Sequence, residues 1–94
     1  MNTFTTIQKM AAKVDSMGWE LITVYMSATR KEAILVCKRD RCPNPDYQYS
    51  TNRAYIAEDG QCHLISGCYD LSHSGALNNA RERALESGFE IFNS

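Results

Sequence analysis

Apolar positions near the start of the chain recur at steps of three and four residues from Ile7 to Met17. In a helix this spacing brings them to one side, which is typical of an amphipathic helix packed on a core. Thr5 and the glutamine three residues later form a capping-box arrangement, and Gly18 stands where a left-handed residue would end the helix. The pattern predicts a helix over about residues 5–17.

After this helix the pattern changes to that of strands. Segment 19–26 is rich in β-branched and aromatic residues, and segment 33–37 is wholly apolar. Because a polar link joins them, they are predicted to form an antiparallel hairpin. Both prolines of the chain fall within segment 41–46, which predicts a loop, since proline lacks the backbone N–H that a sheet requires.

A second hairpin is predicted between segments 48–57 and 61–69. These segments flank Asp59-Gly60, a dipeptide that suits a two-residue type I′ turn because both of its positions need a positive φ. In that register Tyr55 faces Leu64 across the hairpin. The register would place both side chains, together with those of Ala57 and Cys62, on one face of the sheet.

Helical spacing returns over residues 74–87, where small residues alternate with charged ones. Gly88 is placed to end this helix, and segment 89–92 is predicted to be a short edge strand. Together the elements predict an α+β fold of two layers, in which an antiparallel sheet of three to five strands packs with an N-terminal and a C-terminal helix. The residues expected in or near the core are Trp19, Leu21, Ile34, Val36, Leu64, Leu77 and Ala80.

The composition is that of one small domain covering residues 1–94, with 44% hydrophobic and 22% charged residues. The longest run without a polar residue, Ala33–Cys37, is far shorter than the roughly 18 apolar residues of a membrane-spanning helix. The first six residues lack the basic and apolar segments of a secretory leader. We therefore expect a cytoplasmic protein that does not contact a membrane, with free thiols at its four cysteines.

Cysteine and histidine side chains are the obvious candidates for a metal site, because thiolate and imidazole suit zinc. Cys37 and Cys62, however, lie inside predicted strands, where a cysteine is most often a small buried hydrophobe. We therefore expect no metal and no other cofactor.

Three nearby residues offer a candidate for catalysis: Cys68, Asp70 and His73 could supply a nucleophile, an orienting carboxylate and a base. Such groups are recognised by geometry rather than by close sequence order, and a chain of this size has little room for a substrate cleft. The alternative interpretation is that Asp70 or Ser72 caps the last helix, with His73 in its first turn. We favour that interpretation and expect the protein not to be an enzyme.

Charged residues are unevenly distributed, although the formal net charge is only −1. Residues 30–53 hold six basic and three acidic residues, whereas residues 54–94 hold two basic and six acidic ones. Tyrosines lie among the basic residues, so cations that could meet phosphate stand near rings that could stack on bases. The candidate partner-binding residues are Arg30, Lys31, Lys38, Arg39, Arg41, Tyr47, Tyr49 and Arg53.

The acidic C-terminal part opposes long-range attraction to nucleic acid, so independent high-affinity DNA binding is not expected. A surface with patches of both signs suits a protein partner that carries patches of both signs. The alternative interpretation of the basic segment is a solvated face whose charges discourage pairing between sheet edges.

The run Met17-Gly18-Trp19-Glu20-Leu21-Ile22-Thr23-Val24 resembles the "GWELV" signature of small uncharacterised domains common in bacteria and phages. That resemblance covers residues 6–39 and implies a helix packed on a hairpin, with Trp19 as a core anchor. It implies no established chemistry.

The whole chain resembles phage-encoded anti-CRISPR proteins of the class directed against the type I-F surveillance complex. The likeness lies in its size, its α+β pattern and its mixed-charge surface. It implies a non-enzymatic inhibitor in the host cytoplasm, which binds the Cas protein assembly with its guide RNA and blocks target DNA hybridisation. Contact with guide RNA phosphates is one possibility within that interpretation. The alternative is a small accessory or structural phage domain that acts by self-association, through the apolar segment 89–92, or by protein–protein binding.

Overall fold

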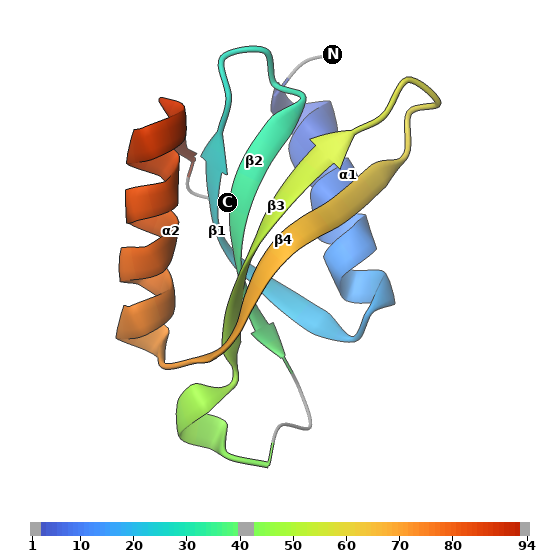
Figure 1. The fold of residues 1–94 in the computed structure, drawn as a ribbon. Coiled ribbons are helices and arrows are strands. Elements are labelled where there is room, and N and C mark those ends of the chain that lie inside the picture. The colour runs from blue at the N-terminus through green and yellow to red at the C-terminus, as the bar shows by residue number, and fades with distance from the viewer. Residues whose placement is uncertain (1–2, 40–42, 93–94) are drawn as a thin grey trace.

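In the part of the chain that the structure describes, five antiparallel strands form one sheet, with a helix before the first strand and another before the last. A computed structural model describes residues 3–39 and 43–92. The elements in chain order are α1 (Thr3–Ser16), β1 (Trp19–Met26), β2 (Glu32–Arg39), the short 3₁₀ helix η1 (Pro45–Tyr47), β3 (Tyr49–Ile56), β4 (Cys62–Leu71), α2 (His73–Ser87) and β5 (Glu90–Phe92). The strand order is β4-β3-β2-β1-β5 (Figure 1). The predicted α+β class and the antiparallel sheet with its two flanking helices are confirmed.

The two helices cover opposite faces of the sheet, as Figure 1 shows. Along β2, Ala33, Leu35 and Cys37 belong to the cluster under α1, whereas Ile34 and Val36 belong to the cluster under α2. β2 is therefore buried on both sides, which explains why its sequence is a continuous apolar run rather than an alternation. The sheet is the middle of three layers, where a sheet in a two-layer structure was predicted.

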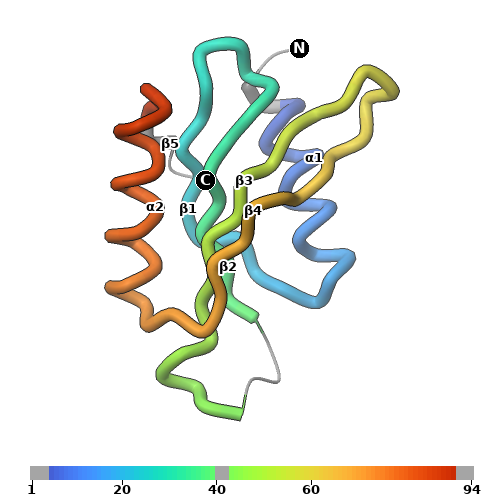
Figure 2. Tube along the Cα trace, in the orientation of Figure 1, coloured from blue at the N-terminus to red at the C-terminus, as the bar shows by residue number. Residues whose placement is uncertain are grey.

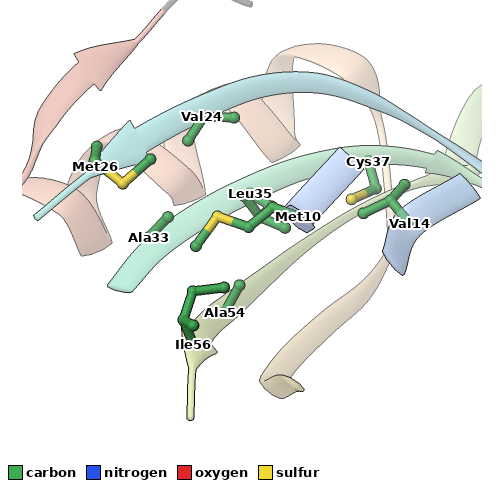
Figure 3. Packing of buried hydrophobic residues seen from close by; sticks show 9 residues of the cluster. All are labelled: Met10, Val14, Val24, Met26, Ala33, Leu35, Cys37, Ala54 and Ile56. Carbon is green, nitrogen blue, oxygen red and sulfur yellow. The ribbon is translucent and has the colours of Figure 1, made fainter. Parts of the chain in front are cut away.

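The larger cluster lies between α1 and the sheet. Met10 and Val14 of α1 meet Val24, Leu35 and their neighbours, and every member of the cluster is buried (Figure 3). On the other face, the buried residues of α2 are all alanines, which lets the helix approach the sheet closely. Each residue predicted for the core lies in one of these clusters or packs against it.

The helix ends match the sequence pattern in three places out of four. Gly18 and Gly88 have positive φ angles of 75° and 71° and follow the two helices, as predicted. Ser72 caps α2, because its Oγ accepts a hydrogen bond of 3.0 Å from the Gly75 N–H. The predicted capping box of α1 is wrong: the helix begins at Thr3, so Thr5 lies inside it and cannot occupy the cap.

The β3–β4 turn is one residue longer than predicted. The Ala57 N–H donates to the Gln61 carbonyl at 2.8 Å, and the Gly60 N–H donates to the Ala57 carbonyl at 2.9 Å. Of the three loop residues only Gly60 has a positive φ, the arrangement of a type I turn followed by one left-handed residue. The extra residue shifts the register, so Tyr55 pairs with His63. The predicted face shared by Tyr55 and the leucine and cysteine of β4 is therefore wrong.

Strand β4 carries two irregularities against β3. The pairing shifts on each side of the Thr51–Cys68 pair. Ser66 and Asp70, one at each irregularity, have positive φ angles of 49° and 57°. Such bulges twist an edge strand and hinder another chain from pairing with it.

In the described residues, no helix is long and apolar enough to cross a membrane.

Candidate docking site

The predicted basic segment is divided between the two ends of β2. Arg30 and Lys31 lie in the β1–β2 turn, whereas Lys38 and Arg39 end the strand. Lys38 lies seven positions after Lys31, which corresponds to roughly 23 Å at about 3.3 Å per strand residue. Figure 2 shows the β1–β2 turn and the segment around η1 at opposite ends of the molecule. These cations therefore do not form one patch.

Two candidate arginines bind other parts of the chain. Arg30 donates from Nη1 to the Ser27 carbonyl at 2.8 Å, within its own turn. Arg53 donates to Ser87 Oγ at 2.7 Å and lies 3.6 Å from the Glu32 carboxylate. Both side chains are thus used to hold turns and elements together.

The two candidate tyrosines differ in exposure. Tyr47 in η1 is exposed, whereas Tyr49 is half-buried and packs against the His73 ring with 5.0 Å between ring centres. Arg41 lies outside the described residues. Four described candidates lie at the same end of the sheet, because Lys38 and Arg39 end β2 while Tyr47 and Tyr49 lie in η1 and at the start of β3.

At that end, Trp19, Arg39, Tyr69 and Asp70 form what we call the aromatic end cluster. The Trp19 and Tyr69 rings meet edge to face, with centres 6.2 Å apart. The Arg39 guanidinium lies 5.0 Å from the Tyr69 ring centre and binds the Asp70 carboxylate at 2.6 Å. The Asp70 side chain also lines a small hollow with Tyr47. The cluster thus joins residues from β1, β2 and β4.

The Tyr69 ring is fixed from beneath by the sheet. Its hydroxyl accepts a hydrogen bond of 3.0 Å from Asn52 Nδ2, and Asn52 is only 1% exposed. The oxygen of the same side chain, Asn52 Oδ1, accepts a hydrogen bond of 3.3 Å from Ser50 Oγ. Gly67 leaves room for the ring, because a Cβ at that position would meet Tyr69 ring atoms at less than contact distance. Tyr69 therefore has one position that the surrounding residues define.

The exposure of the cluster determines what it can bind. Tyr69 is 45% exposed and the Asp70 side chain 82%, whereas the Arg39 side chain is 17% exposed. An incoming group would meet an aromatic ring and a carboxylate, with the guanidinium behind them. A carboxylate at the surface repels phosphate, whereas fixed Tyr, Trp and Arg side chains are the residues that dominate protein–protein contacts.

Two of the three residues that could form a catalytic group, Asp70 and His73, contact different side chains. Asp70 binds Arg39, and His73 begins α2 with its ring against Tyr49. Ser72, rather than Asp70, is the residue that caps the helix. In the part of the chain that the structure describes, no group of three histidine, cysteine or acidic side chains could hold a metal ion.

The cysteine thiols differ in their surroundings. Burial raises the pKa of the Cys37 thiol from 9.0 to about 12. Burial also raises the pKa of Cys62, although the nearby Lys13 ammonium opposes this effect. Both cysteines are therefore held as neutral thiols at physiological pH, which does not favour nucleophilic chemistry.

Comparisons with protein-family profiles, with curated protein sequences and with solved structures found no match for this chain. The candidate contact surface is therefore inferred from the geometry and chemistry of the described residues. Sequence reasoning missed the role of Tyr69 because its neighbours come from three other strands. One local signal was available: a glycine inside a strand pattern, here Gly67, often marks a bulge or a close approach of another group.

Proposed function

We propose that this protein is a non-catalytic inhibitor that binds a guide-RNA-loaded Cas surveillance complex and prevents target DNA from hybridising. The aromatic end cluster, together with Tyr47, is its contact surface. The resemblance of the whole chain to phage-encoded anti-CRISPR proteins supports the choice of partner. The choice of surface rests on one observation: an exposed Tyr69 ring that Asn52 and Arg39 hold in a fixed position.

A fixed ring favours binding because little side-chain freedom remains to be lost when a partner arrives. Tyrosine, tryptophan and arginine are also enriched among the few residues that supply most of the energy of an interface. The exposed Asp70 carboxylate adds polarity and favours a basic protein surface over guide RNA phosphates. The contact is therefore proposed to be with a protein subunit of the complex.

The proposal can be tested by measuring target DNA binding to a purified type I-F surveillance complex in the presence of this protein. Replacing Tyr47 and Tyr69 by alanine should raise the half-inhibitory concentration at least about tenfold, the effect of losing roughly 1.4 kcal/mol at a hot spot. Ile65→Ala is the matched control, because Ile65 lies on the same strand as Tyr69 and is 44% exposed against 45%.

Tyr69→Phe separates binding from stability. This variant keeps the ring and its contact with Arg39 but loses the hydrogen bond from Asn52, so it should lose much less inhibition than the alanine variant while unfolding at a lower urea concentration. Arg39→Glu is a poor probe, because it breaks an internal ion pair. Unchanged inhibition by the double alanine variant would contradict the contact surface. A stable homodimer with no affinity for the complex would contradict the partner and favour self-association.

A further inference from the structure

The first irregularity of β4 sets two residues of this strand against one residue of β3. Ser66 and Gly67 lie between two paired residues of β4, and only Asn52 lies between their partners on β3. This is the two-against-one arrangement of a β-bulge. Ser66 has a positive φ of 49°, a conformation that a residue with a Cβ keeps only where its surroundings hold it. The bulge therefore depends on contacts with its surroundings.

Arg83 of α2 supplies such a contact. Its Nη2 donates to the Ser66 carbonyl at 2.7 Å, and its Nη1 donates to Thr51 Oγ1 at 3.2 Å. Thr51 is buried, and its hydroxyl donates in turn to Asn79 Oδ1 at 2.5 Å. Asn79 and Arg83 lie four positions apart and so share one side of the helix. One planar guanidinium thus binds both β3 and β4 at the bulge, which fixes the direction as well as the distance of the contact.

Arg83 and the Tyr69 ring act on opposite faces of the sheet. Thr51 pairs with a residue of the cluster under α2, whereas Asn52 pairs with a residue of the cluster under α1. The Tyr69 hydroxyl accepts its hydrogen bond from Asn52. Figure 1 shows the two helices on opposite sides of the sheet. Arg83 therefore reaches the sheet from the side opposite to this hydroxyl, and its effect on the ring passes through the β4 backbone.

The backbone connection from the bulge to the ring is short. The Ser66 carbonyl that Arg83 binds belongs to the same planar peptide unit as the Gly67 nitrogen. The Tyr69 ring lies over Gly67 so closely that a Cβ there would meet ring atoms. A bond to the Ser66 carbonyl thus fixes the peptide on which the ring rests. Without that bond the peptide can rotate, and the support of the ring moves with it.

We propose that Arg83 is a positioning residue for the aromatic end cluster. From the α2 face it holds the first bulge of β4, and through Gly67 this bulge sets the place of the Tyr69 ring. The ring can therefore meet a partner in one position although much of its surface is exposed. The importance of this position for binding rests on the proposed function, whereas the link between Arg83 and Tyr69 can be measured without any partner.

The test follows the ring through Trp19, the only tryptophan of the chain. The Tyr69 ring meets it edge to face, so the ring current of the tyrosine contributes to the chemical shift of the Trp19 indole N–H. In ¹⁵N-labelled protein, Tyr69→Ala gives the position of this signal without the ring. Arg83→Met retains most of the side-chain length and removes the donors. Its indole signal should move from the wild-type position toward that of Tyr69→Ala.

Three further variants separate positioning from stability. Arg81→Met removes the same charge from an exposed position of the same helix and should leave the indole signal in place. Thr51→Val removes one acceptor of Arg83 and the bond to Asn79 but keeps the Ser66 carbonyl, so it should lower the urea midpoint and move the signal much less than Arg83→Met. Arg83→Lys keeps one donor, and its signal should lie between those of the wild type and Arg83→Met.

The same variants are then compared in the inhibition assay with the surveillance complex. Arg83→Met should raise the half-inhibitory concentration at least about threefold, the effect of a ring that is in place about a third of the time. A wild-type indole signal in folded Arg83→Met, or an equal movement in Thr51→Val, would overturn the positioning role. The spectra do not involve the complex, so a wild-type protein that fails to inhibit would contradict the proposed function alone.

Discussion

Replacing Gly67 by alanine should disturb the aromatic end cluster without removing any of its side chains. A Cβ at this position would meet the Tyr69 ring, and Gly67 lies in the first irregularity of β4, directly before the paired residue Cys68. The ring should therefore leave the position in which it contacts Arg39 and Trp19 and accepts a hydrogen bond from Asn52.

The magnitude follows from these three contacts. Leaving the buried Asn52 amide without its partner costs about 1–3 kcal/mol. Loss of the cation–π and edge-to-face contacts adds about 1–2 kcal/mol for groups that are partly exposed. The alanine also lowers the conformational entropy of the unfolded chain, and this effect offsets about 0.4–1 kcal/mol of the loss of stability. The free energy of unfolding should therefore fall by about 1–5 kcal/mol, a large part of the about 5–15 kcal/mol typical of a whole domain.

Urea unfolding followed by tryptophan fluorescence measures this change, because Trp19 is the only tryptophan of the chain and lies in the cluster. Tyr69→Phe should remove only the hydrogen-bond contribution. Combined with Gly67→Ala it should add little, since the first substitution already separates the ring from Asn52. Wild-type stability of Gly67→Ala, or full additivity in the double variant, would refute the role assigned to Gly67.

Two further predictions concern stability away from the cluster. The Cys37 thiol has its pKa raised from 9.0 to about 12 on folding, so its contribution is fully present below about pH 9 and is lost as the pH rises toward 12. Urea midpoints at about pH 8 and about pH 10.5 should therefore differ less for Cys37→Ala than for the wild type; an unchanged difference would mean that this thiol is accessible to solvent. Ser72→Ala should cost about 0.5–2 kcal/mol, because the Gly75 N–H loses its acceptor, whereas Ser74→Ala in the first turn of α2 should change the urea midpoint little.

Local sequence patterns were sufficient to predict most of the fold. Segment 19–26 was predicted as a strand with the bounds that the structure shows, because its β-branched and aromatic residues end at a glycine and at a polar link. The layer arrangement was not predictable in the same way. The spacing of apolar residues shows that each helix has a buried side, but it does not show which face of the sheet either helix covers.

The errors in detail have identifiable physical causes. Asp59-Gly60 suits both a two-residue turn and the last part of a three-residue one, and the choice between them moves the register of β4 by one residue. The candidate binding residues were grouped because they are close in sequence. An extended strand, however, carries residues seven positions apart to opposite ends of a sheet. Lys31 and Lys38 are therefore distant in space although they are close in sequence.

The aromatic end cluster could not be predicted because its members are distant in sequence. Trp19 and Tyr69 belong to β1 and β4, and they meet across two intervening strands. Arg39 was predicted to contact a partner because it lies in the basic segment, where cations stand near tyrosine rings. Within the chain it binds Asp70, which belongs to the acidic part, so the two oppositely charged segments partly neutralise each other at the protein surface.

The pairing of β5 with β1 has a consequence for synthesis on the ribosome. Val24 and Phe92 pair although they are about 70 residues apart in sequence, and such distant contacts form late because a long loop must close first. The strands from β1 to β4 are each paired with the next one along the chain, so they can assemble while translation continues. During that interval Val24–Met26 of β1, the residues that later pair with β5, have no strand beside them on the side away from β2. A nascent chain is therefore most exposed to pairing with other unfinished chains before β5 has been made.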